Sequence, residues 1–151
     1  MNFYMPKTIE FGPIVMESIV SKIDPSKFDL TLAPDRFTLR EAVAHLADWE
    51  PIFLERMEKI KAESGVLIEG IDEGELAIKN RYQDQDLYEN LALWKSRRAE
   101  TAKFLRALTD EDRAKFCRRR DLPDHSLEDM GNIIVCHDMY HLEHAGLYLQ
   151  D

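Results

Sequence analysis

Hydrophobic residues recur at helical spacing in four long stretches of the chain, and polar segments separate these stretches. Within each stretch apolar side chains return every three or four residues, as on an α-helix with one buried face. No segment shows the alternation of apolar and polar residues that a half-buried strand would show. We therefore expect an all-α protein, with residues 1–151 forming one domain built as a four-helix bundle. The long helices are expected over 8–23, over 39–62, from Asp84 or Asp86 to 108, and over 127–150, with short helical turns over 75–79 and 109–116.

Capping residues stand where several of these helices should begin. At three starts a Ser or Thr precedes an acidic residue by three positions, so that each side chain can accept the other residue's backbone N–H. These pairs are Thr38 with Glu41, Thr109 with Asp112, and Ser126 with Asp129. Pro13 places the start of the first helix near itself, and Pro51 should kink the second near Ala47, because proline lacks a backbone N–H.

The connection between the second and third helices, residues 64–85, is unusually long for a helical bundle. Bundle connections commonly have about 2–8 residues. A helix over 39–62 is about 36 Å long at about 1.5 Å per residue, and this connection can span that length. We therefore expect the second and third helices to be parallel neighbours rather than a hairpin.

Composition and charge exclude several classes of partner. Hydrophobic residues make up 44% of the chain and charged residues 32%, as in a globular protein. A net charge of −9 argues against binding to nucleic acid or to an anionic membrane. No apolar run approaches the roughly 20 residues of a membrane span, and residues 1–6 do not resemble a signal peptide. Cys117 and Cys136, the only cysteines, do not make a disulfide framework, so we expect a cytoplasmic protein.

Histidines gather near the end of the chain, where three of the five fall within eight residues. His137 and His141 stand one turn apart on the same helical face, and two such imidazoles can converge on one ion. His45 is the only other histidine within a helix body, and the mostly apolar face around it should turn inward. The spacing predicts a divalent-metal site made by these three residues, with an open position for water. The alternative is a set of buried imidazoles hydrogen-bonded to one another and to water.

Several neighbours could complete such a site. His144, one turn beyond His141, could be a fourth ligand, a proton-transfer group or a residue of the polar rim, and we favour the rim. Asp48 could orient an imidazole or be an ordinary surface acid. Aromatic side chains near the histidines could line a pocket or donate a hydrogen bond, although aromatics at helical spacing are more often plain core. They are Trp49, Tyr140 and Tyr148.

Other polar residues receive different assignments. Glu50 and Glu143 point away from the histidine faces on a helical wheel, so no carboxylate is placed as a general base. Arg56 and Arg98 lie on inward stripes and could pair with carboxylates of a small cofactor or form internal salt bridges. His125 is expected in a solvated loop. The far side of the last helix is also apolar and needs a cover, which predicts a homodimer.

The chain resembles the DinB-like (DinB/YfiT) superfamily over nearly its whole length. The most specific part is the H-x3-H of His137 and His141 together with the H-L-x-D that begins at His45. The remaining segments match mainly as a pattern. They are Asn80–Tyr82 with Asp86–Leu87, Leu105–Asp112 and Ser126–Asp129.

This resemblance implies a bundle of up-down-down-up topology and a divalent ion, usually nickel or zinc, held by His45, His137 and His141. Members often carry Gln three residues after the last ligand, where this chain has His144, so the metal and its coordination number stay open. The family includes suspected hydrolases, transferases that use a low-molecular-weight thiol, and many dimers. We expect a metal-dependent hydrolase acting on a small molecule. The alternatives are a metal-dependent thiol transferase and a non-catalytic, stress-associated binding protein.

Overall fold

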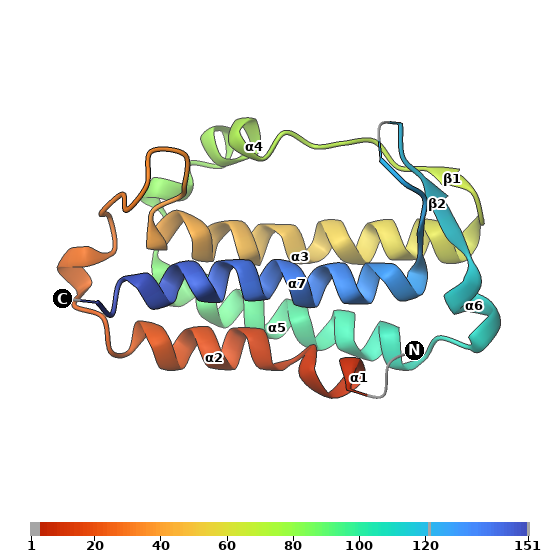
Figure 1. Ribbon diagram of the computed structural model, residues 1–151, viewed down its shortest axis with the longest axis horizontal. Helices are drawn as coiled ribbons and strands as arrows, with labels where there is room; N and C mark the ends of the chain where they lie inside the picture. The colour runs from red at the N-terminus through yellow and green to blue at the C-terminus, as the bar shows by residue number, and fades with distance from the viewer. Residues whose placement is uncertain (1–3, 121, 151) are drawn as a thin grey trace.

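A computed structural model describes residues 4–120 and 122–150, and four long helices lying side by side dominate it (Figure 1). The long helices are α2 (Phe11–Val20), α3 (Leu39–Ala62), α5 (Leu87–Arg106) and α7 (Leu127–Leu147). The short ones are α1 (Met5–Thr8), η1 (Pro25–Lys27), α4 (Glu73–Lys79), η2 (Tyr82–Asp84) and α6 (Asp110–Ala114). The expected all-α four-helix bundle is confirmed. The assignment of residues 1–151 to one domain stays a prediction, because residues 1–3, 121 and 151 lie outside the described part.

The helices follow an up-down-down-up order. In Figure 1, α3 and α5 run in the same direction, and α2 and α7 run in the opposite one. The segment after α3 returns along the length of that helix and carries α4, so α5 starts beside the start of α3. Because α3 and α5 are also in contact, the expectation that they are parallel neighbours is confirmed.

A small three-stranded sheet closes one end of the bundle, and the hydrophobic pattern did not predict it. Its strands are β1 (Val66–Leu67), β2 (Phe116–Arg118) and β3 (His125–Ser126), in the order β1-β2-β3. Cys117 pairs in parallel with Val66 and antiparallel with His125. The loop assignment of His125 was therefore wrong, since this residue is half-buried in a strand. Strands of two or three residues are too short to show an alternating pattern, and pairing between distant segments creates them.

The capping residues behave as the sequence predicts. The Thr38 hydroxyl accepts the N–H of Glu41 at 3.2 Å, and the Glu41 carboxylate accepts the N–H of Thr38 at 2.9 Å. The same reciprocal bonds open α6 and α7. Asp86 caps α5 by accepting the N–H of Glu89 at 2.9 Å. These local bonds fix where each helix begins and hence the phase of its buried face.

Pro51 lies inside α3, which continues through it to Ala62. Because proline has no N–H, the carbonyl of Ala47 loses its usual helical donor. Arg97 of α5 supplies a replacement, since its Nη1 donates to that carbonyl at 2.6 Å. Pro51 therefore leaves a carbonyl of α3 free to accept a hydrogen bond from α5, and this bond joins the two helices.

The apolar core forms two clusters along the bundle. One cluster contains Phe53 to Ile60 of α3 and Leu127 to Ile134 of α7, and the other contains Leu39 to Ala47 and Ala145. Turns of α3, α5 and α7 bring histidines, carboxylates and an arginine to the middle of the molecule. Within the described residues, no helix combines the length and apolarity that crossing a membrane requires.

Candidate metal centre

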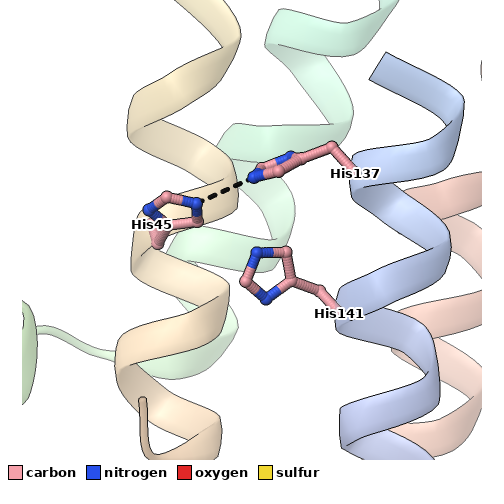
Figure 2. A group of neighbouring side chains, drawn as sticks. All are labelled: His45, His137 and His141. Atoms are coloured by element: carbon pink, nitrogen blue, oxygen red, sulfur yellow. Dashed lines mark hydrogen bonds between the residues drawn. The ribbon is translucent and has the colours of Figure 1, made fainter. Parts of the chain in front are cut away.

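Three imidazoles from two helices point toward one another in the middle of the bundle (Figure 2). His45 comes from the second turn of α3, and His137 and His141 come from successive turns of the facing α7. The Nε2 atoms of His45 and His137 are 2.9 Å apart. One nitrogen from each of the three rings lies within 4.8 Å of the others, so the expected convergence is confirmed.

The donor set fits a divalent cation. At a metal–nitrogen distance of about 2.0–2.1 Å, two ligand nitrogens of a tetrahedral site lie about 3.3 Å apart. The Nε2 atoms of His45 and His137 are 2.9 Å apart, and the donor nitrogens of the three rings all lie within 4.8 Å of one another, which is close to that spacing.

Burial keeps these imidazoles neutral. It lowers the pKa of His45 to about 3, with the neighbouring His137 adding to the effect. Burial likewise lowers the pKa of His137 to about 4, helped by the charge of Arg98, and that of His141 to about 2, helped by the other histidines. Each ring therefore carries a free nitrogen lone pair at pH 7, which is the form that binds a metal.

Aromatic rings surround the histidines and limit access of water from the bundle side. The ring centroid of His45 lies 5.2 Å from Phe37, 5.6 Å from Trp49 and 6.4 Å from Tyr82. Phe53 lies edge-on to His137 at 5.6 Å. Such an apolar wall lowers the local dielectric and so strengthens electrostatic interactions within the site.

The outward nitrogens of the three rings are not hydrogen-bonded. The Nδ1 atoms of His45, His137 and His141 are buried and have no partner among the described residues. Metal-binding histidines commonly donate this N–H to a carboxylate or carbonyl. Asp48 does not fill that role, because its carboxylate accepts hydrogen bonds from Asn80 at 2.5 Å and Tyr82 at 3.1 Å. Asp48 acts on the site only by holding Tyr82, whose ring lies edge-on to His45.

A cavity of about 480 Å³ adjoins the histidines. Its walls come from α7, from the loop before α3 and from the start of α4. The lining residues are Pro34, Asp35, Arg36, Phe37, Glu73, Gly74, His137, Tyr140, His141 and His144. Tyr140 is thus placed where the sequence reasoning suggested. Trp49 instead packs against the imidazoles from the bundle side, and the hydroxyl of Tyr148 donates to the carbonyl of Leu30 at 2.7 Å.

His144 is buried in this cavity wall rather than exposed at a rim. It is 1% exposed and stands outside the group of three converging imidazoles. Its Nε2 has no hydrogen-bond partner among the described residues. Burial lowers the pKa of His144, and the charge of Arg36 lowers it further. The His144 side chain thus adds a buried polar group to the lining of the cavity.

Besides Asp35, two charged cavity residues were missed by sequence reasoning. Arg36 stacks over the ring of Tyr140, with 4.8 Å between its guanidinium carbon and the ring centroid, and pairs with Glu143 at 3.0 Å. Glu73, in the first turn of α4, also lines the cavity, and partial burial raises its pKa. Neither residue belongs to a long amphipathic stripe, so no periodic signal could single them out. They reach the site through the fold of the two connections.

The two inward arginines form internal contacts rather than lining the cavity. Arg98 pairs with Glu50 and with Asp138, which lies next to His137 in the sequence. Arg56 donates to the carbonyl of Glu69 at 3.2 Å and lies over Trp49 at 5.1 Å. For Arg98 the internal salt bridge, one of the two alternatives, is therefore the observed one. The pairing also explains why Glu50 takes no part in the histidine site.

Comparison with known proteins assigns the chain to a family. A model of the DinB superfamily matches residues 9–145. The chain belongs to the DinB superfamily. No curated protein matches it. Among solved structures, YfiT from Bacillus subtilis, described as a probable metal-dependent hydrolase with an unusual four-helix bundle topology, superposes with a TM-score of 0.88 at 23% identity. The match covers 95% of this chain and 83% of YfiT.

A second solved structure, the DinB-like protein YjoA from Bacillus subtilis, superposes with a TM-score of 0.62 at 14% identity. The match covers 96% of this chain and 89% of YjoA. At these identities both likenesses concern the fold alone. The family assignment and the converging histidines agree with the motif on which the sequence resemblance rests.

Proposed function

We propose that this DinB superfamily protein is a metal-dependent hydrolase of a small molecule, with His45, His137 and His141 holding one divalent ion. The observation that carries the proposal is the convergence of three neutral imidazole nitrogens, all within 4.8 Å of one another, beside a cavity of about 480 Å³. The description of YfiT as a probable metal-dependent hydrolase supports the same assignment. Nickel and zinc are the ions we expect, because the resemblance to the family implies them, and imidazole suits both.

A bound divalent ion would supply a Lewis acid and a water of lowered pKa at this position. The surrounding residues would exclude water, contact the substrate and transfer protons. The aromatic wall of Phe37, Trp49 and Phe53 keeps bulk water away from the imidazoles. A substrate in the cavity would meet His137 and His141 of α7 and Glu73 of α4, which all line it. His144, Glu73 and Asp35 are cavity groups that can accept or return a proton.

The cavity volume limits the substrate to a small molecule. Ligand pockets commonly measure about 300–1,000 Å³, and this cavity lies in the lower half of that range. The sides that a substrate would touch are partly aromatic, through Phe37 and Tyr140, and partly charged, through Arg36 and Glu73. We expect a compound of modest size with both an apolar part and a polar group. Neither a nucleic acid nor a membrane surface is part of the proposal.

Metal binding is the first test, on protein purified without an affinity tag. Elemental analysis should find about one divalent ion per chain, and the stripped protein should rebind Zn²⁺ or Ni²⁺. His141→Ala should lose that binding. His125→Ala is the matched control, because His125 lies in β3 outside the histidine group, and it should bind as the parent does. Failure of the parent protein to bind either ion would leave only the non-catalytic reading.

Turnover is the second test. The loaded protein should hydrolyse members of a panel of small esters and amides, and His141→Ala should not. His144→Gln should keep the metal while losing turnover if His144 moves a proton, and should lose both if it is a ligand. A loaded protein that leaves the panel untouched but is thermally stabilised by low-molecular-weight thiols would favour the transferase instead.

A further inference from the structure

A second polar cluster lies in the bundle beside the histidines, centred on Arg98 of α5. Its Nε and Nη2 donate to the two carboxylate oxygens of Glu50 on α3, each at 2.8 Å. Its Nη2 also donates to Asp138 of α7 at 2.9 Å, and its Nη1 donates to Asp138 and to the carbonyl of Ile9 at 2.7 Å. All five N–H groups of the guanidinium are therefore used.

This cluster connects the same two helices that carry the histidines. Asp138 directly follows His137 on α7, and Glu50 stands five residues after His45 on α3. Five residues of helix correspond to about 7.5 Å along its axis. One planar guanidinium thus joins α3 to α7 at a level close to the imidazoles. Its fork geometry fixes both the separation of the two helices and their relative height.

Net stability does not explain why these charged groups are buried together. One cation faces two carboxylates, and the side chains of Arg98, Glu50 and Asp138 are only 2%, 1% and 5% exposed. Buried charged groups lose their hydration, and packed apolar residues of similar volume often stabilise a core at least as well. Geometric specificity is what a saturated guanidinium offers and an apolar core does not. A metal site needs that specificity, since its ligand distances tolerate errors of only a few tenths of an ångström.

Gly12 of α2 shows how closely the cluster is built. A Cβ at this position would lie 2.3 Å from Oδ2 of Asp138 and 2.9 Å from its Cγ. Asp138 cannot move away freely, because Arg98 holds both of its oxygens. The bare backbone of Gly12 therefore leaves the space that Asp138 occupies.

We propose that Arg98, through Glu50 and Asp138, is the positioning residue that sets α7 against α3 so that His45, His137 and His141 can share one ion. The proposal rests on the metal site assigned above. Arg98 touches neither the cavity nor the imidazole nitrogens that face the ion. It acts by holding the two helices in register, and the affinity for the metal reports that register.

Arg98→Lys is the first test, because lysine keeps the positive charge but cannot form the planar fork. Leu105→Ala is the matched control, since Leu105 is a fully buried residue of the same helix α5, seven residues beyond Arg98 and outside the hydrogen bonds of the cluster. Urea unfolding of the stripped proteins and Zn²⁺ titration should be measured for both. Arg98→Lys should bind Zn²⁺ about 10–100-fold more weakly, the usual result of removing a group that supports metal ligands. Leu105→Ala should lose stability and stay within about twofold of the parent affinity.

Gly12→Ala keeps the proposal testable if Arg98→Lys does not fold. This substitution changes no charge and no ligand, yet it pushes on Asp138, so Zn²⁺ affinity should fall and the visible spectrum of the Co²⁺-loaded protein should change. Unaltered affinity and spectrum in both cluster variants would overturn the positioning role. An equal loss of affinity in Leu105→Ala would also overturn it, because the effect would then follow stability alone. Absence of metal binding in the parent protein is a different result, since it removes the metal site itself.

Discussion

The histidine group and the Arg98 cluster join the same two helices in opposite ways. Around Arg98 every N–H has an acceptor, and the three charged side chains are closed off from solvent. Around the histidines three Nδ1 atoms lack partners, and a cavity opens beside the rings. Buried polar groups that have all their hydrogen-bond partners stabilise one arrangement of the helices, whereas polar groups that lack a partner can bind a ligand. The contrast separates a site that positions helices from a site that can bind something.

Removing the central residue of each site should give the sharpest contrast in stability. Arg98→Leu leaves Glu50 and Asp138 buried without their cation and should lower the free energy of unfolding by about 3–5 kcal/mol. His45→Leu removes a single hydrogen bond, the one to His137, together with an Nδ1 that has no partner among the described residues, so it should change the stability of the stripped protein by only about 1 kcal/mol. Urea unfolding of both variants measures this. Equal losses would mean that the histidines hold the fold as much as the arginine does.

Bound metal should raise the stability of the folded protein, and it should do so through the histidine group alone. Zn²⁺ at about one hundred times its dissociation constant should raise the free energy of unfolding by about 2.7 kcal/mol, because the ion binds the folded chain alone. His141→Ala should show none of this increase, and His125→Ala should show all of it. Thermal melts with and without Zn²⁺ give the answer, and a gain retained in His141→Ala would point to a different binding place.

Acid should weaken the stripped protein through its histidines. The folded-state pKa values of His45, His137 and His141 are lowered to about 3, 4 and 2, below the ordinary value near 6.5. Between pH 6.5 and about 4 the histidines therefore bind protons in the unfolded chain but not in the folded chain. The free energy of unfolding falls as the pH falls through this range. Each histidine adds a slope of up to about 1.4 kcal/mol per pH unit.

The His45→Leu variant isolates this effect from the titration of carboxylates. It should lose stability less steeply than the parent between pH 6.5 and 5, by about one histidine's share. Urea midpoints measured at several pH values provide the comparison. Parallel slopes for the two proteins would show that His45 is not held neutral by burial.

Much of the fold followed from local signals, and the Arg98 cluster shows where such signals end. Thr38, Thr109 and Ser126 could be read as caps because their partners lie three residues away. The convergence of His45 with His137 and His141 could also be predicted from the sequence, since the apolar face around His45 indicated that its side chain points into the bundle. Arg98 was ambiguous from sequence, because its partners lie 40 and 48 residues away and only the packed bundle brings them together. Glu73 could not be predicted at all, because the path of a connection decides its place.

The outer surface should be the least sensitive region. Phe11, Ile14 and Val15 of α2 and Met139 of α7 are exposed at 53%, 48%, 42% and 59%, and these two helices pack together. We propose that a second copy of the chain covers this face. Ile14→Asp should shift the mass in solution from dimer to monomer while changing Zn²⁺ affinity less than twofold. A monomeric parent protein at micromolar concentration would contradict the dimer and leave the contrast between the two inner sites untouched.

The strand-bearing connector that returns over α3 contributes Glu73 and Gly74 to the cavity, while the imidazoles stand on helices locked into the core. Lengthening or reshaping a surface connector costs little free energy, because loop-closure entropy grows only slowly with length. Changes in this connector can therefore alter part of the cavity lining while His45, His137 and His141 keep their places on α3 and α7.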